Sequence, residues 1–193
     1  MTLLVTLLLV PTAAGVVSYF IRSNRLRRLL WGAAAAFHFA ASIAISLPAP
    51  PAAFDGWIGV DSLSAVFLVL TSLLFLAVTV YGIGYVHQEP VPSRRDPQDG
   101  RPANNEPESI FTGSLLLLLA TMSLAVVSRH FALQWVAIEA TTLASAPLVY
   151  YHRSRRSLEA AWKYVILCSV GIGLALLGIF FIRMTVPGGL DVL

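Results

Sequence analysis

Six long apolar stretches decide what this chain can fold into. A helix needs about 20 apolar residues to cross the hydrocarbon of a bilayer, and each stretch is close to that length. Only 12% of the 193 residues are charged and 57% are hydrophobic, whereas a soluble domain carries about 25% charged residues. A soluble cytosolic enzyme is therefore excluded. The stretches cover approximately residues 3–21, 29–47, 62–86, 110–127, 131–151 and 158–182.

These stretches predict helices rather than strands. Backbone N–H and C=O groups inside a bilayer must be paired within a helix or a closed barrel. The alternation of apolar and polar residues that marks barrel strands is absent. We therefore expect an all-α integral membrane protein, with a single membrane domain over 1–193 that forms a bundle of six transmembrane helices. The first stretch is expected to be retained, because its basic residues follow the apolar part, unlike those of a signal peptide.

The basic residues predict how the helices are oriented. Cytoplasmic loops of membrane proteins carry an excess of lysine and arginine. Ten arginines lie in the connections after the first, third and fifth stretches, and two in the other connections. Loop 87–109 is thus expected in the cytoplasm, and both termini on the non-cytoplasmic side. This pattern reflects topology and not a nucleic-acid surface. The ten are Arg22, Arg25, Arg27, Arg28, Arg94, Arg95, Arg101, Arg153, Arg155 and Arg156; the two are Arg129 and Arg183.

Glu139 is a charged residue that no loop explains. It comes eight residues after Phe131 and twelve before Tyr151, so the helical rise places it about 12 Å and 18 Å from the two ends. An ionised carboxylate at that depth costs a few kcal/mol unless it faces protein, water or a partner charge. We interpret Glu139 as a proton or ion site. The alternative is a neutral glutamic acid hydrogen-bonded to a neighbouring helix.

Lys163 is the second charge inside a predicted helix. It lies about 7 Å into the last stretch by helical rise, so its long side chain can reach the membrane surface. Glu159 precedes it by one turn and Arg156 lies three residues further back, which puts the three on one helix face. The side chains are interpreted as part of a proton path, with Glu159 auxiliary. The alternative is a charged strip at the cytoplasmic surface.

Other polar residues give weaker signals. His38, in the second stretch, can titrate near neutral pH and is a possible auxiliary of an ion path, but a lone histidine among small residues also fits hydrogen-bonded packing. Asp61 is expected to cap the helix that begins at residue 62, with Ser64 three residues on.

No cofactor or metal site is predicted. Cys168 is the single cysteine, and no zinc, haem or iron–sulfur ligand set is present. Gly171, Gly173 and Gly178 lack the strand that precedes a nucleotide-binding loop, and within an apolar helix they are expected to allow close helix packing.

The segment WVAIEATTLASAPLVYYHRSRRSLEAAWKYVILCSVGIGLALLG (135–178) resembles a known family, with GVDSLSAVFLVL (59–70) as a supporting landmark. The chain is similar to the N-terminal part of the antiporter-like proton-pumping membrane subunits of respiratory complex I, Mrp-type antiporters and membrane-bound hydrogenases, in particular the hydrogenase-4 component F type. The resemblance implies a bacterial plasma membrane protein with other membrane subunits as partners. The family's fifth-helix glutamate corresponds to Glu139, and a sixth-helix lysine to Lys163.

The resemblance also leaves functions open. In the family, the glutamate pairs with a lysine on a broken seventh helix, and this chain ends before such a helix. We therefore expect either a truncated or split gene product or a short subunit that another chain completes. The first hypothesis is translocation of protons or sodium; the alternative is a structural module that anchors or seals an oxidoreductase complex. An unrelated transporter or membrane enzyme is disfavoured, because the chain lacks a catalytic cluster. The redox reaction of the parent complex stays open.

The predicted topology can be tested by cysteine labelling. Single cysteines at Gln98 and Gly188 should react from opposite sides of the membrane, because the arginine distribution places them on opposite sides. Labelling of both from the same side would contradict the orientation.

Overall fold

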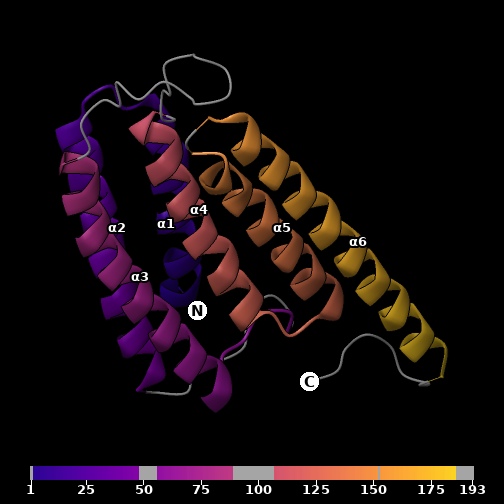
Figure 1. Cartoon of the computed structure of the whole chain (residues 1–193). Helices are drawn as coiled ribbons and strands as arrows, with labels where there is room; N and C mark the ends of the chain where they lie inside the picture. Colours follow the sequence, from indigo (N-terminus) through magenta and orange to yellow (C-terminus); the bar gives the residue numbers. More distant parts are fainter. Residues whose placement is uncertain (1, 48–55, 89–106, 152, 186–193) are drawn as a thin grey trace.

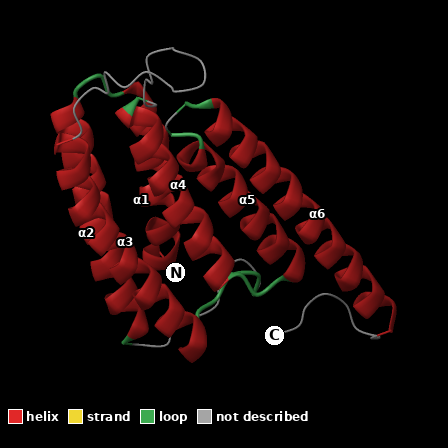
Figure 2. Ribbon diagram, in the orientation of Figure 1, coloured by secondary structure: helices red, strands yellow, loops and turns green. Residues whose placement is uncertain are grey.

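The structure is a computed structural model that describes residues 2–47, 56–88, 107–151 and 153–185. In these ranges the regular structure is helical (Figures 1 and 2), and each helix is long and apolar enough to cross a membrane. The predicted fold class is confirmed, while the sides on which the termini lie stay a prediction. The six helices are α1 (Thr2–Phe20), α2 (Asn24–Ser46), α3 (Ser62–Gln88), α4 (Glu108–Val127), α5 (Phe131–Val149) and α6 (Arg155–Thr185).

The helix bounds differ from the apolar stretches at several ends. α2 begins at Asn24 instead of 29, α6 begins at Arg155 instead of 158, and α5 ends at Val149 instead of 151. The two early starts add arginine-rich turns. The apolar stretches did not include these turns, because apolarity marks only the part of a helix that lies in hydrocarbon. Residues 89–106 of the loop predicted at 87–109 lie outside the described residues.

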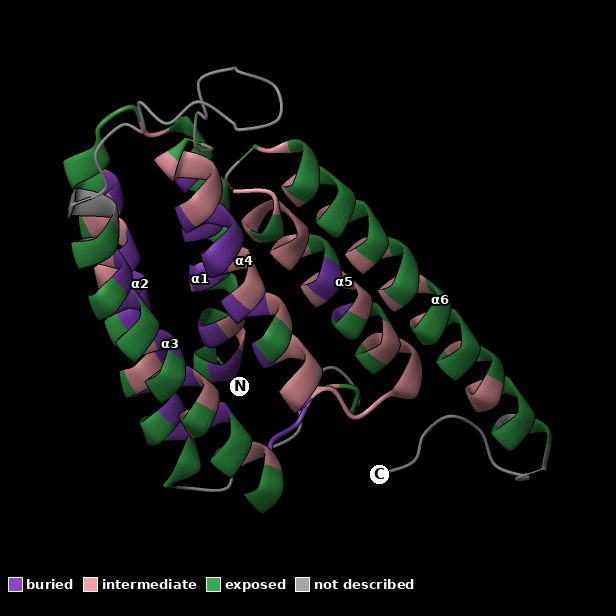
Figure 3. Ribbon diagram, viewed as in Figure 1, coloured by how far each residue is buried: buried purple, intermediate pink, exposed green. Residues whose placement is uncertain are grey.

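The bundle is packed around α4. This helix contacts α1, α2, α3 and α5, whereas α6 contacts only α5 among the described helices. Figure 1 shows α2 and α3 on one side of α4 and α6 at the opposite edge. Burial follows this arrangement (Figure 3): half of the apolar part of α4 is buried, and none of α6. The core therefore lies among α1–α4, and α5 and α6 extend from it.

Two apolar clusters fill this core. Both draw on α1, α2, α3 and α4, and they occupy different levels along the helices. The first lies toward the bundle end that holds residues 56–61 and 128–130. Ile58 and Ser128 form an isolated antiparallel β-bridge there, and we call this the bridge end. The second lies toward the end that holds residues 21–23 and 153–154, called here the arginine-rich end. The first consists of Leu4, Leu7, Ala41, Ile45, Val60, Leu68 and Val127; the second of Ala14, Trp31, Ala34, Ala35, Phe75, Leu115, Leu116 and Leu119.

Glycines bring α1 and α4 close together. A Cβ atom added to Gly15 would lie 3.2 Å from the carbonyl oxygen of Gly113, and one added to Gly113 would lie 2.8 Å from the ring of Tyr19. Small residues allow such close approach between membrane helices. Within the described residues the expectation of close packing at the glycines of α6 is wrong, because a Cβ at Gly171, Gly173 or Gly178 would meet no described atom within 4 Å.

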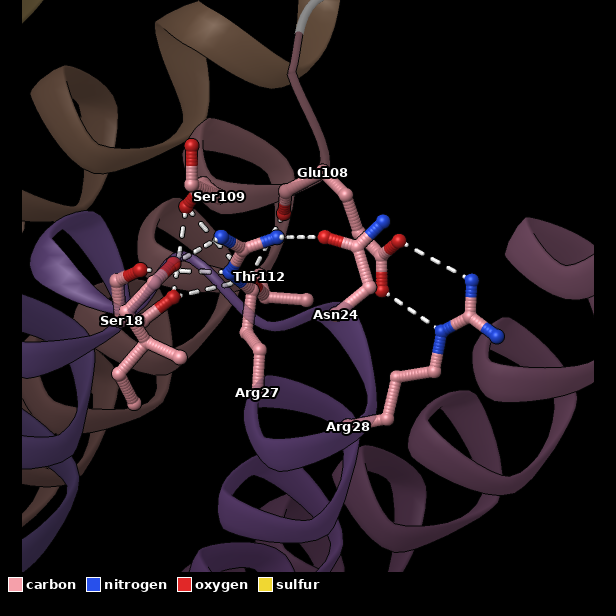
Figure 4. A network of polar contacts seen from close by, with 8 residues as sticks. Ser18, Asn24, Arg27, Arg28, Glu108, Ser109 and Thr112 are labelled. Carbon is pink, nitrogen blue, oxygen red and sulfur yellow. Dashed lines mark hydrogen bonds and ion pairs between the residues drawn. The ribbon is translucent and has the colours of Figure 1, made fainter.

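Arginines tie three helix ends together at the arginine-rich end (Figure 4). The last carbonyls of a helix have no partner within it. Buried Arg27 donates from Nε to the carbonyl of Ser18 at 3.3 Å and also to the carbonyl of Ile21, both near the end of α1. Arg28 joins the start of α2 to the start of α4 through two bonds to the Glu108 carboxylate, at 2.7 and 3.0 Å. These contacts explain why the helix α2 begins before its apolar stretch.

The glycine crossing predicts a difference between two leucine substitutions. Gly113→Leu should lower the stability of the purified protein by about 1–3 kcal/mol, because the added side chain would overlap Tyr19 and separate α1 from α4. Gly178→Leu adds the same atoms where the described residues leave open space and should have little effect. Thermal loss of helical circular dichroism in one detergent measures both, and equal stability of the two variants would contradict the role of the crossing.

Candidate functional site

Glu139 lies in the middle of a membrane-crossing helix. It is eight residues after the start of α5 and ten before its end, which corresponds to about 12 and 15 Å. Its Oε1 atom accepts a hydrogen bond of 2.9 Å from the hydroxyl of Ser169 on α6. Its Oε2 atom is buried and has no hydrogen-bond partner among the described residues. The carboxyl group is therefore half-satisfied.

The contact with Ser169 belongs to a row of polar contacts between α5 and α6. Trp135 donates from its indole nitrogen to the carbonyl of Ile172 at 2.9 Å. Further along α5, the hydroxyls of Ser145 and Tyr164 are 2.7 Å apart. Residue numbers rise along α5 and fall along α6, so the helices run antiparallel with Glu139 between the other two contacts. We call this row the α5–α6 polar seam.

The sequence reasoning missed the partners in this seam. Ser145, Tyr164 and Ser169 carry no distinguishing sequence signal, because hydroxyl residues occur on all faces of helices in membranes. Their spacing gives no clear signal either: at about 100° per residue, Ser169 lies about 140° around α6 from Tyr164. Their pairing still required the geometry of the two helices.

Lys163 faces away from this seam. Its ammonium group forms an ion pair with the carboxylate of Glu159, one turn earlier on α6, and both side chains are about two thirds exposed, at 69% and 64%. The shared face predicted for these two residues is thus present. Among the described residues no basic side chain forms an ion pair with Glu139. The part of Lys163 in an ion path stays a prediction.

His38 joins three helices in the centre of the core. Its imidazole is fully buried; Nδ1 lies 2.8 Å from the hydroxyl of Ser72 on α3, and Nε2 lies 2.9 Å from that of Ser123 on α4. Each hydroxyl also lies 2.7 Å from the backbone carbonyl one turn earlier in its own helix: Ser72 from that of Leu68, and Ser123 from that of Leu119. A neutral imidazole offers one donor and one acceptor, so one serine donates to the ring and the other accepts from it.

This arrangement favours a packing role for His38. On α2 it stands between Ala34 and Ala35 of one apolar cluster and Ala41 of the other. No contact joins α2 to α5 within the described residues, because α4 lies between them. The structure therefore does not bring His38 together with Glu139, and its auxiliary role in an ion path stays a prediction.

The predicted cap at Asp61 is confirmed. Its Oδ1 atom accepts the backbone N–H of Ser64 at 2.7 Å, which satisfies one of the free donors at the start of α3. No group of three or more histidine, cysteine, aspartate or glutamate side chains among the described residues could hold a metal ion.

The fold and the half-satisfied carboxyl define a multi-pass helical membrane protein with a polar seam at mid-membrane. The chain is 35% identical over 135 residues to the hydrogenase-4 component F homolog of Methylacidiphilum infernorum, which is 68% of this chain and 27% of that protein. It is 41% identical over 54 residues to NADH-ubiquinone oxidoreductase chain 2 of Xenopus laevis, 28% of this chain and 16% of the relative. No protein-family model matches.

These matches confirm the resemblance predicted from the sequence. The chain is similar, over part of their length, to the antiporter-like membrane subunits found in complex I and hydrogenase-type complexes. The aligned part spans about a quarter of the first relative.

The packing role of His38 predicts the effect of its removal. His38→Leu should destabilise the protein by about 1–3 kcal/mol, because two interhelical hydrogen bonds are lost. Each serine can still hydrogen-bond to the backbone carbonyl one turn earlier in its own helix. Phe37→Leu on the exposed side of α2 is the control. Thermal unfolding in detergent measures the stability, and a loss of ion movement per folded subunit would show instead that His38 lies on a path.

Proposed function

We propose that this chain is an antiporter-like membrane subunit, or the N-terminal part of one, that moves protons or sodium ions in a respiratory or hydrogenase-type oxidoreductase complex of a bacterial plasma membrane. The names of the two relatives support the kind of complex, since one is a hydrogenase component homolog and the other a chain of an NADH oxidoreductase. The observation that carries the ion-binding role is the half-satisfied carboxyl of Glu139.

The seam gives this carboxyl two workable states. When Glu139 is ionised, the hydroxyl of Ser169 donates to Oε1 and stabilises the charge. When it is protonated, the carboxyl carries no charge and can itself donate a hydrogen bond through its O–H. A cation that approaches the unpartnered Oε2 favours ionisation, and its withdrawal favours proton uptake. Glu139 can therefore work as a switch whose state follows a neighbouring charge.

The cation and the exit path would come from outside the described helices. α6 contacts only α5 among them, so the α5–α6 polar seam lies at an edge of the bundle where further helices can pack. Helices of the same protein or of other membrane subunits would supply the partner charge. In this proposal the Glu159–Lys163 pair sets the charge of α6 toward the arginine-rich end and tunes proton entry to the seam.

A structural role remains the competing function. A module that only anchors or seals a complex would also need six apolar helices. The two functions differ in whether the titration of Glu139 matters.

Glu139→Gln tests this difference in the assembled parent complex. Coupled ion movement should fall to background, because glutamine keeps the volume and hydrogen bonding of the side chain but cannot bind and release a proton. Assembly should be intact. Glu159→Gln makes the same chemical change on an exposed residue that in this proposal only tunes proton entry, so it should lower the activity in part and not to background. Lys163→Ala should have a milder effect than Glu139→Gln.

The measurement is proton or sodium uptake into vesicles driven by the parent enzyme, with subunit content determined in parallel. Normal uptake with Glu139→Gln would reject the switch and leave the structural role.

A further inference from the structure

A cavity with charges of both signs opens at the bridge end of the bundle. Its volume is about 510 Å³, and it lies between the start of α3, the end of α4 and the start of α5. Asp61 and Arg129 line it together with the polar side chains of Ser64 and Gln134. Because these helices cross the membrane, their ends lie where the polar headgroups of the bilayer are.

The backbone fixes the position of Arg129. Two antiparallel hydrogen bonds join the segments on either side of the cavity: Gly59 N–H to the Val127 carbonyl at 2.9 Å, and Arg129 N–H to the Trp57 carbonyl at 2.8 Å. The arginine side chain then lies against Gly59, where an added Cβ would come within 2.6 Å of Nε. A side chain added at residue 59 would therefore push the guanidinium out of this position.

Asp61 supplies the opposite charge. The Ser64 side chain and backbone N–H hydrogen-bond to its carboxylate, and with a smaller effect of Arg129 they hold the pKa of Asp61 below its usual value. Asp61 and Arg129 act on each other through space without forming an ion pair. Each charge is thus left able to bind a further group of opposite sign.

The wall of the cavity continues onto an apolar surface of α3. Leu63 and Phe67 line the cavity and are 65% and 50% exposed. In a bilayer these side chains lie beside the acyl chains. A ligand of this site therefore carries a positive and a negative group at one end and hydrocarbon at the other.

We propose that this cavity binds a zwitterionic phospholipid with a phosphoethanolamine headgroup, its phosphate on Arg129 and its ammonium on Asp61. Arginine binds phosphate oxygens through two N–H groups at once. A primary ammonium donates hydrogen bonds to a carboxylate, which a choline headgroup cannot do. A lipid with net negative charge would gain Arg129 but bring no cation to Asp61. The site is independent of the ion path proposed for Glu139.

Native mass spectrometry of the purified full chain tests this site. The chain is titrated in detergent with phosphatidylethanolamine, phosphatidylcholine and phosphatidylglycerol that have identical acyl chains. The ethanolamine lipid should bind about tenfold more tightly than the other two, a ratio that corresponds to about 1.4 kcal/mol. Equal binding of the three lipids, preference for the glycerol lipid, or binding of none would overturn the proposal.

Variants assign the binding to the cavity. Arg129→Gln and Asp61→Asn should each reduce ethanolamine lipid binding to the level of the choline lipid; asparagine still caps a helix. Gly59→Ala keeps every charge but displaces the guanidinium, so it should cause the same loss of lipid binding. It tests the role of Arg129 even if circular dichroism shows that Arg129→Gln does not fold. Arg22→Gln removes an exposed arginine at the arginine-rich end and should bind as the unmodified protein does. Unchanged binding in the Gly59→Ala and Asp61→Asn variants would overturn the proposal.

Discussion

The bilayer removes water from the polar atoms of this chain, and the rest of the structure follows from that constraint. An unpaired polar group in hydrocarbon costs several kcal/mol. Hydroxyl groups in the helices accordingly donate to the carbonyl one turn earlier, as Thr12, Thr79 and Thr121 do. A hydroxyl group that faces another helix joins the two helices through a hydrogen bond. Ser72 and Ser123 hold His38 in this way, while Ser169 holds Glu139.

Because unpaired polar atoms are costly in a membrane, the buried ones that lack a hydrogen-bond partner are informative. Two buried side-chain atoms have no hydrogen-bond partner among the described residues: Nε1 of Trp31 and Oε2 of Glu139. Trp31 is fully enclosed in the core of α1–α4, and its indole has a single fixed proton. Glu139 lies beside α6, no part of which is buried, and a carboxyl can gain or lose a proton. The unpartnered oxygen thus belongs to a group that can change its charge, which is why the function is proposed there.

Features that depend on neighbouring residues alone could be predicted from the sequence of this protein. Hydropathy and length gave six membrane-crossing helices, and the rise per residue gave the depth of Glu139 in its helix. Short spacings predicted the cap at Asp61 and the shared face of Glu159 and Lys163, both of which the structure contains. These features depend only on neighbours within about one helical turn, so no knowledge of the packing was needed.

Which helix faces meet could be learned only from the folded bundle. Lipid and protein interior are almost equally apolar, so no polar face marks the side of a membrane helix that is exposed. The sequence therefore did not show that Gly15 and Gly113 pack closely while no described atom lies against the glycines of α6. For the same reason it did not show that Glu139 bonds Ser169 rather than Lys163. Contacts between residues far apart in the chain are fixed by the antiparallel register of α5 and α6, and that register exists only in the folded bundle.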